Sequence, residues 1–128
     1  MADTKVVLFA DPDRDLLRSL DYLMGKSSED VSIFTASDGA TAVRMVCEFK
    51  PRLVVLNVDL GPEDAFGVWR RIKEAWPGCD AELLLMGERQ RLDATKAQAD
   101  EAGANGTLAK PFTPEQVRLV VRRGLQET

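Results

Sequence analysis

Polar side chains stand at the ends of the most apolar segments of this sequence. LVVLNVDL, residues 53–60, carries Asn57 and Asp59 at its end, and the run KVVLFA is followed by Asp11 and Asp13. A buried strand that ends in a polar residue usually delivers that side chain to a site at the sheet edge. A carboxylate there can act as a nucleophile, whereas an amide nitrogen is delocalised into its carbonyl and cannot. The amide at position 57 therefore needs an explanation.

Short apolar runs alternate with amphipathic stretches along the whole chain. We expect strands over residues 5–10, 31–36, 52–58, 82–87 and 106–109. We expect helices over residues 14–24, 38–49, 65–76, 91–103 and 113–125, where apolar residues recur at helical spacing. Strands that alternate with helices predict a single α/β domain over residues 1–128, with a doubly wound parallel sheet covered on both faces. The site is then expected at the carboxyl ends of the strands.

Composition narrows the chemistry that this site can perform. The chain has 128 residues, a net charge of −4 and a pI of about 4.9, which argues against nucleic acid or an anionic membrane as a direct partner. It contains no histidine, so histidine-based catalysis and most zinc sites are excluded. Cys47 and Cys79 lack the CxxC spacing and are expected to be reduced thiols.

The same pattern predicts where the protein resides. Every apolar run is shorter than the ~20 residues that a membrane span requires, and the start MADTK lacks the features of a signal peptide. We therefore expect a cytoplasmic protein. Its sequence fits a stand-alone domain and the N-terminal domain of a longer protein equally well.

Five segments carry a family resemblance. They are VVLFADPD (6–13), TASDGATAV (35–43), KPRLVVLNVDL (50–60), EDAFGVWRRIK (63–73) and EAGANGTLAKPF (101–112). In this order and spacing they resemble the receiver domain of bacterial response regulators, over essentially the whole chain. The resemblance implies the five-stranded flavodoxin-like (βα)5 receiver fold, in agreement with the elements expected above.

The resemblance also implies a reaction. Receiver domains accept a phosphoryl group from a histidine kinase on an aspartate at the end of the third strand. Two acidic residues after the first strand help to hold Mg²⁺, and a Ser or Thr and a Lys hold the phosphoryl oxygens. In this sequence the acceptor position falls on Asn57, because Pro51 and the run from Leu53 to Leu56 fix the register.

The two acidic positions fall on Asp11 and Pro12, so one acid is missing. An alternative register, shifted by one residue, would place Ala10 and Asp11 there. That register would bury Asp15 and Arg18 of the following helix, whereas the preferred one buries the apolar residues Leu16, Leu20, Leu23 and Met24. In either register a single acid remains.

The remaining positions of the pocket also depart from the family pattern. The Ser or Thr position falls on Gly87, or on Glu88 if the alignment shifts by one residue. The aromatic position of the fifth strand, which usually reports the phosphorylated state, falls on Thr107. Lys110 is retained, before Pro111, and the peptide bond between them is often cis in this family. We expect Lys110 to pair with Asp11 and to donate to the Asn57 carbonyl.

This altered pocket predicts a pseudo-receiver, a phosphorylation-independent protein-interaction module in bacterial signal transduction or motility. We expect no catalytic residue, no cofactor, and absent or weak Mg²⁺ binding, because Mg²⁺ usually requires carboxylate ligands. Family members usually dock partners through the fourth helix, fifth strand and fifth helix. The exposed positions expected on that face are Lys96, Gln98, Asp100, Glu101, Arg118, Arg122 and Arg123.

Two alternatives belong to other functional classes. The first is a receiver phosphorylated at a shifted acid, Asp59 or Asp13, with a bound divalent metal. The second is an independent enzyme on the same fold, such as a phosphatase or a flavin-binding electron carrier. The second is disfavoured because the sequence has no glycine-rich phosphate loop, no GxSxG motif and no Cys–His pair.

Overall fold

The computed structural model of the chain describes residues 5–25 and 30–126. Its main sheet is parallel and has the strand order β2-β1-β3-β6-β7. These strands are β1 (Lys5–Ala10), β2 (Val31–Ala36), β3 (Leu53–Asn57), β6 (Glu82–Glu88) and β7 (Gly106–Lys110). All five coincide with predicted strands to within a residue at either end, which confirms the doubly wound α/β fold. A polar loop is expected over GKSSED, residues 25–30, and its residues 26–29 lie outside the described ranges.

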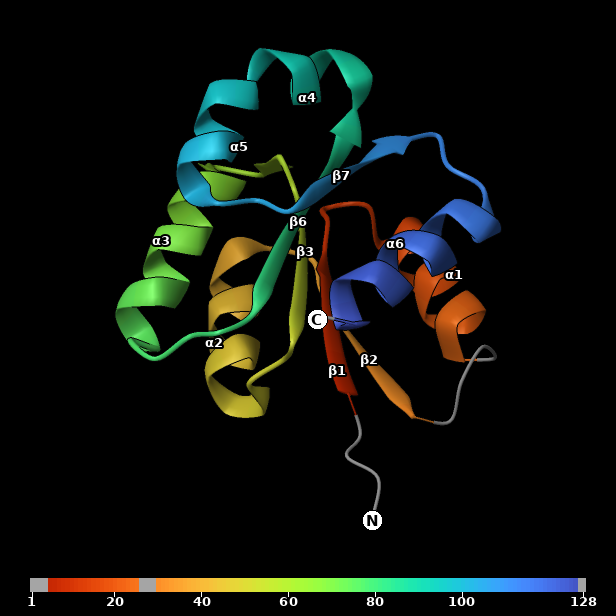
Figure 1. Cartoon of the computed structure of the whole chain (residues 1–128), viewed down its shortest axis with the longest axis horizontal. Helices are drawn as coiled ribbons and strands as arrows, with labels where there is room; N and C mark the ends of the chain where they lie inside the picture. Colours follow the sequence, from red (N-terminus) through yellow and green to blue (C-terminus); the bar gives the residue numbers. More distant parts are fainter. Residues whose placement is uncertain (1–4, 26–29, 127–128) are drawn as a thin grey trace.

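Helices cover both faces of this sheet (Figure 1). Their bounds are α1 (Arg14–Gly25), α2 (Gly39–Phe49), α3 (Ala65–Ala75), α4 (Arg89–Ala94), α5 (Lys96–Ala102) and α6 (Pro114–Gln126). The side chains of α1 and α6 pack on one face of the sheet, and those of α2 to α5 pack on the other. The core is therefore divided into two layers by the sheet.

Alternation along the central strand explains why both layers are apolar. Leu53 and Val55 of β3 pack in the layer beneath α1 and α6, whereas Val54 and Leu56 pack in the layer beneath α2 and α3. Successive side chains of a strand point to opposite faces, so a strand covered on both sides must be apolar at every position. All four of these residues are fully buried. Asn57 is the first residue of β3 to break the apolar run, and it does so at the carboxyl end.

The single helix predicted over residues 91–103 is wrong. The structure has two short helices there, because Thr95 is not helical and separates α4 from α5. The Thr95 hydroxyl donates to the Arg91 carbonyl at 2.7 Å, and the side chain is buried. A threonine that bonds back to the preceding turn competes with the helical hydrogen bonds and bends the helix.

A small hairpin that the sequence did not predict follows β3. Strands β4 (Asp59–Leu60) and β5 (Glu63–Asp64) are antiparallel and are joined by Gly61 and Pro62. Gly61 has a φ of +88°, a backbone conformation that favours glycine. The hairpin places Asp64 at the start of α3, where its carboxylate accepts the N–H of Gly67 at 2.9 Å. It therefore holds the segment between Asn57 and α3 in a fixed shape.

Other helix starts agree with the sequence. Asp38 accepts the N–H of Thr41 at the start of α2. The sequence TPEQ at residues 113–116 has the capping-box pattern, and in the structure Thr113 and Gln116 exchange side-chain to backbone hydrogen bonds of 2.7 and 3.1 Å. Cys47 and Cys79 are free thiols, as expected. Within the described parts of the chain, no helix is both long enough and apolar enough to cross a membrane.

Close packing of α2 against α3 depends on Gly39. A Cβ atom at this position would lie 2.6 Å from Cγ2 of Val68 and 2.8 Å from the carboxylate of Glu63. Val68 is fully buried and cannot move away easily. The glycine is therefore required by the approach of two helices and not by a turn.

We predict that Gly39→Ala lowers the free energy of unfolding by about 1–3 kcal/mol, because the added methyl group overpacks the α2–α3 contact. Urea denaturation measures the change. Gly78→Ala is the control, since a Cβ at Gly78 meets nothing within 4 Å. Its effect should stay within about 0.5 kcal/mol. Equal stability of the two variants would contradict this account of Gly39.

Candidate functional site

An ion pair closes the carboxyl edge of the sheet. Asp11 directly follows β1 and is only 1% exposed, and Lys110 is the last residue of β7. The Lys110 Nζ donates to Oδ2 of Asp11 at 2.5 Å, and the other carboxylate oxygen accepts the N–H of Asp13 at 2.9 Å. A buried carboxylate requires such partners. The predicted pairing of Lys110 with Asp11 is therefore confirmed.

Asn57 is held by its own loop. Its Nδ2 donates to the backbone carbonyl of Asp59 at 2.7 Å. The Oδ1 atom is buried and has no hydrogen-bond partner among the described residues. The expected donation from Lys110 to this oxygen is thus wrong, and the ammonium group donates to Asp11 instead. The amide is fixed through its nitrogen, and its oxygen is left unsatisfied.

Gly87 forms the wall next to this oxygen. A Cβ built at Gly87 would lie 3.7 Å from Oδ1 of Asn57 and 3.6 Å from Val58, both ordinary van der Waals distances. A side chain at this position would therefore reach the amide. Because residue 87 is glycine, no hydroxyl is present to donate to Asn57 or to a ligand.

Asp59 is used by a second ion pair. Arg91 of α4 donates from Nε and Nη2 to the two carboxylate oxygens of Asp59, at 3.0 and 2.8 Å. The hydrogen bonds from Arg91 are the main reason why the pKa of Asp59 lies below its ordinary value of 3.8. The same bonds raise the pKa of Arg91. This two-point contact joins the hairpin after β3 to α4.

The other predicted residues do not converge on Asp11. Asp13 caps α1 through hydrogen bonds from the N–H groups of Asp15 and Leu16, both at 3.1 Å. Pro12 and Glu88 are exposed, and Thr107 is exposed on β7. The burial of α1 agrees with the preferred register in part. Asp15 and Arg18 are exposed and Leu20 and Met24 are buried, as expected, whereas Leu16 and Leu23 are half-buried and the buried residue on this turn is Leu17.

Two predicted pocket residues offer side-chain oxygens here. They are Asp11, whose two carboxylate oxygens each accept a hydrogen bond, and Asn57, whose Oδ1 has no partner among the described residues. No group of three or more His, Cys, Asp or Glu residues that could hold a metal ion occurs in the described ranges. An incoming cation at this site would meet the Lys110 ammonium group.

The comparison with protein families decides the identity of the fold. The sequence matches the family described as Response regulator receiver domain over residues 7–122. The chain belongs to this family. Receiver domains act in two-component signalling, and the relatives of this one are named as regulators.

Two curated relatives illustrate the match. The alkaline phosphatase synthesis transcriptional regulatory protein PhoP of Bacillus subtilis is 30% identical over 127 residues, which cover 97% of this chain and 50% of the relative. The DNA-binding transcriptional regulator NtrC of Rhizobium meliloti is 33% identical over 121 residues, which cover 94% of this chain and 24% of the relative. This receiver domain thus spans half of the length of PhoP and a quarter of that of NtrC.

Solved structures show the same fold. A response regulator from Chloroflexus aurantiacus superposes with a TM-score of 0.83 at 22% identity, covering 98% of this chain and 100% of the other. The chemotaxis protein CheY4 of Vibrio cholerae gives a TM-score of 0.82 at 18% identity, covering 95% and 99% of the two chains. At these identities the likeness is one of fold alone.

Arg91 is the residue of the receiver site that sequence reasoning missed. Its partner Asp59 lies 32 residues earlier, so no local spacing announces the pair. The Gly-Pro dipeptide at residues 61–62 was a usable signal for the hairpin that presents Asp59.

The Lys110–Pro111 bond is cis, as the resemblance implied.

The predicted interaction face is only partly as expected. Lys96 and Asp100 are exposed on α5, with 3.7 Å between the Lys96 Nζ and the Asp100 Oδ2. Arg122 and Arg123 are exposed on α6. Arg118, expected to be exposed, is half-buried.

We predict that Lys110→Met lowers the free energy of unfolding at neutral pH by about 3 kcal/mol, because it leaves the buried carboxylate of Asp11 without its cation. Urea denaturation measures this loss. Lys96→Met removes an equal charge from an exposed pair and should change stability by less than about 0.5 kcal/mol. Similar losses in the two variants would show that the Asp11–Lys110 pair has no special role.

We further predict a titration effect at Asp59. Because its folded pKa lies below 3.8, the Arg91 contact stabilises the fold above the unfolded pKa, and this stability is lost as the pH falls through the folded pKa. Arg91→Ala should return the pKa of Asp59, followed by carboxyl NMR, to its ordinary range. The difference in urea midpoint between Arg91→Ala and the unaltered protein should vanish when the pH falls below the folded pKa of Asp59. Arg89→Ala, on the same helix, is the control that should leave the Asp59 pKa unchanged.

Proposed function

We propose that this receiver domain is a pseudo-receiver: a phosphorylation-independent protein-interaction module of cytoplasmic signal transduction or motility in bacteria, and not an enzyme. One observation carries the proposal. Asp11 and Lys110 are paired with each other, while the acceptor position holds an amide that donates to the Asp59 backbone carbonyl. The groups that a phosphoryl ligand would need are absent or already bonded.

The first support is the nucleophile. An aspartate can attack phosphorus and form an acyl phosphate, whereas the Asn57 nitrogen is uncharged and donates a hydrogen bond to the backbone carbonyl of Asp59. The second support is the missing hydroxyl at Gly87. A side chain there would reach Asn57, so its absence removes a donor from the place where a phosphoryl oxygen would be bound.

The third support concerns Mg²⁺. The residues present do not fit this ion, which prefers octahedral oxygen ligands with one or two carboxylates. Asp11 would have to exchange Lys110 for the metal, Pro12 supplies no side-chain ligand, and Asn57 is neutral. Weak or absent Mg²⁺ binding follows from this donor set.

The fourth support is the position of Thr107. Its side chain is exposed on β7 and is not aromatic. Other receivers report phosphorylation through an aromatic side chain at this position. This chain has no aromatic side chain there. The face formed by Lys96, Asp100, Arg118, Arg122 and Arg123 is therefore proposed to bind a protein partner in one fixed state. Nucleic acid is not the proposed partner of this acidic domain.

The alternative, phosphorylation at a shifted acid, is less well supported. Both oxygens of Asp59 are engaged by Arg91, and Oδ1 of Asp13 caps α1. Either carboxylate would have to give up its partner before it could act as a nucleophile. Among the described residues, neither Asp59 nor Asp13 belongs to a group of three or more His, Cys, Asp or Glu side chains that could hold a divalent metal.

We predict that the purified domain gains no phosphoryl mass when it is incubated with acetyl phosphate and Mg²⁺ and measured by intact-mass spectrometry. A receiver domain with an aspartate acceptor serves as the positive control. Amide NMR with Mg²⁺ and beryllofluoride should likewise leave the resonances of Asp11, Asn57, Gly87 and Lys110 in place. A mass gain that disappears in Asp59→Asn or Asp13→Asn would overturn the proposal in favour of the shifted acceptor.

A further inference from the structure

The chain contains two asparagines, and their surroundings differ. Asn57 ends β3, and Asn105 immediately precedes β7. Asparagine is a labile residue, because the carbon of its carboxamide can be attacked by the backbone nitrogen of the next residue. The attack depends on how firmly the carboxamide is held and on how open that nitrogen is. Both conditions differ between the two residues.

Both reacting groups are engaged at Asn57. Its Nδ2 donates to the Asp59 carbonyl at 2.7 Å, which fixes the carboxamide. The attacking nitrogen would be that of Val58, whose N–H donates to the Met86 carbonyl at 2.8 Å. Val58 is fully buried, and its branched side chain is stiff and shields its own nitrogen. The amide at the acceptor position is therefore protected.

Neither group is engaged at Asn105. Its side chain is exposed and makes no hydrogen bond with a residue that the structure describes. Its backbone N–H donates to the Leu83 carbonyl at 2.8 Å, toward β6. Successive N–H groups of an extended chain point to opposite sides, so the N–H of Gly106 points away from β6. Because β7 is the last strand of the described sheet, that side is an open edge.

Gly106 adds no steric barrier of its own. It has no Cβ, so no side chain shields its nitrogen. A Cβ at this position would lie 3.1 Å from Cδ2 of Leu84, which is a core residue. Packing therefore favours glycine here, and it leaves an unshielded nitrogen beside an unbonded carboxamide.

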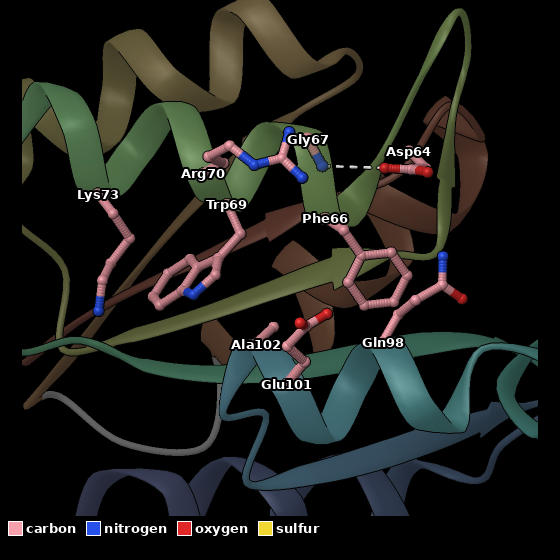
Figure 2. Close-up of a pocket in the computed structure, with 9 residues that line it drawn as sticks. All are labelled: Asp64, Phe66, Gly67, Trp69, Arg70, Lys73, Gln98, Glu101 and Ala102. Carbon is pink, nitrogen blue, oxygen red and sulfur yellow. Dashed lines mark hydrogen bonds between the residues drawn. The ribbon is translucent and has the colours of Figure 1, made fainter.

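The chain is anchored on both sides of this pair. Helix α5 lies beside α3, and Ala102 at its end lines the hollow between the two helices (Figure 2). The Ala104 N–H donates to the Ala99 carbonyl at 3.0 Å, and Leu108 of β7 is buried. Closure of a ring between the carboxamide and the next nitrogen therefore involves rearrangement at the open edge, while the packed residues on either side stay in place.

We propose that Asn105–Gly106 is a site of spontaneous deamidation and that Asn57 is not. The Gly106 nitrogen forms a bond to Cγ of Asn105, and the bond from Cγ to Nδ2 breaks. The proton of the Gly106 nitrogen passes to the departing NH2 group, which leaves as ammonia. Water then opens the cyclic imide at either carbonyl and gives aspartate or isoaspartate at position 105. Water is the one co-reactant, and no oxidant or reductant is required.

The product changes the charge of a defined surface. Asn105 lines two adjoining hollows, one shared with Lys96 and the other with Arg123. A carboxylate at position 105 adds a negative charge to the face proposed to bind a partner, and isoaspartate also adds one atom to the main chain before β7. This consequence rests on the proposed function, whereas the reaction does not. Protection of Asn57 prevents the acceptor position from turning into an aspartate as the protein ages.

The test incubates the purified whole chain in mildly alkaline buffer and follows it by intact mass and peptide mapping. Replacement of an amide NH2 by OH raises the mass, and mapping locates the change and separates aspartate from isoaspartate. We expect conversion at Asn105 to exceed that at Asn57 on the order of 100-fold, because only Asn105 brings an unbonded carboxamide to an open nitrogen.

A parallel incubation in urea separates the effect of the fold from that of the local sequence. Unfolding should speed conversion at Asn57, which then loses its hydrogen bonds. It should change conversion at Asn105 by less than about tenfold, because the fold leaves the reacting groups of Asn105 open.

Matched variants identify the reacting groups. Asn105→Gln should abolish the mass gain, because its longer side chain would have to close a larger ring. Gly106→Ala should slow the gain by about tenfold, because the added methyl group shields the nitrogen. Gly78→Ala, the same change in open space, should convert as the unaltered protein does. Circular dichroism and urea unfolding establish that each variant is folded.

Four results would overturn the inference. They are an unchanged Asn105 after prolonged incubation, equal conversion of the two asparagines, an undiminished mass gain in Asn105→Gln, and conversion of Asn105 that is far faster in urea than in the folded chain. None of them bears on the proposed function, because acetyl phosphate labelling of freshly purified protein decides phosphorylation separately.

Discussion

The buried carboxylate of Asp11 is the constraint on which the carboxyl edge of the sheet depends. It is 1% exposed and lies 99 residues from the lysine that neutralises it, so the two ends of the chain must fold together before the charge is matched. The pair links the end of β1, an interior strand, to the end of β7, the edge strand. Around it the pocket has one anion, one cation and one neutral amide, a balance that requires no bound ion.

This balance explains why an amide is tolerated at the end of β3. A carboxylate at position 57 would add a second negative charge to the pocket, where the cation Lys110 is paired with Asp11. Asn57 keeps the shape of an aspartate and replaces the extra charge with a donor for the Asp59 carbonyl. The Oδ1 atom of Asn57 is left without a partner among the described residues. A buried acceptor without a donor lowers the stability of the fold.

Sequence reasoning succeeded where the physics is local or repetitive. The strands and most helices follow from periodicity, and the cap of α6 follows from the spacing of Thr113 and Gln116. It failed at Thr95, where one hydroxyl group divides a helix whose apolar pattern is continuous. It also missed the pair of Arg91 with Asp59, which lie 32 residues apart, whereas the more distant pair of Asp11 with Lys110 was expected from the family resemblance. Lys110 pairs with Asp11 and not with Asn57 because Asp11 is buried and charged. That burial depends on the whole fold, so the sequence does not reveal it.

The direct passage from β6 into α4 has a consequence for cooperativity. Glu88 ends β6, pairs in register with Lys110 of β7, and is followed at once by Arg89 of α4. With no intervening residue to absorb a rotation, α4 cannot swing without loosening the last rungs of the β6–β7 ladder. We therefore expect these three elements to act as one unit of local unfolding, in which the amides of a short surface helix open together with those of a sheet edge.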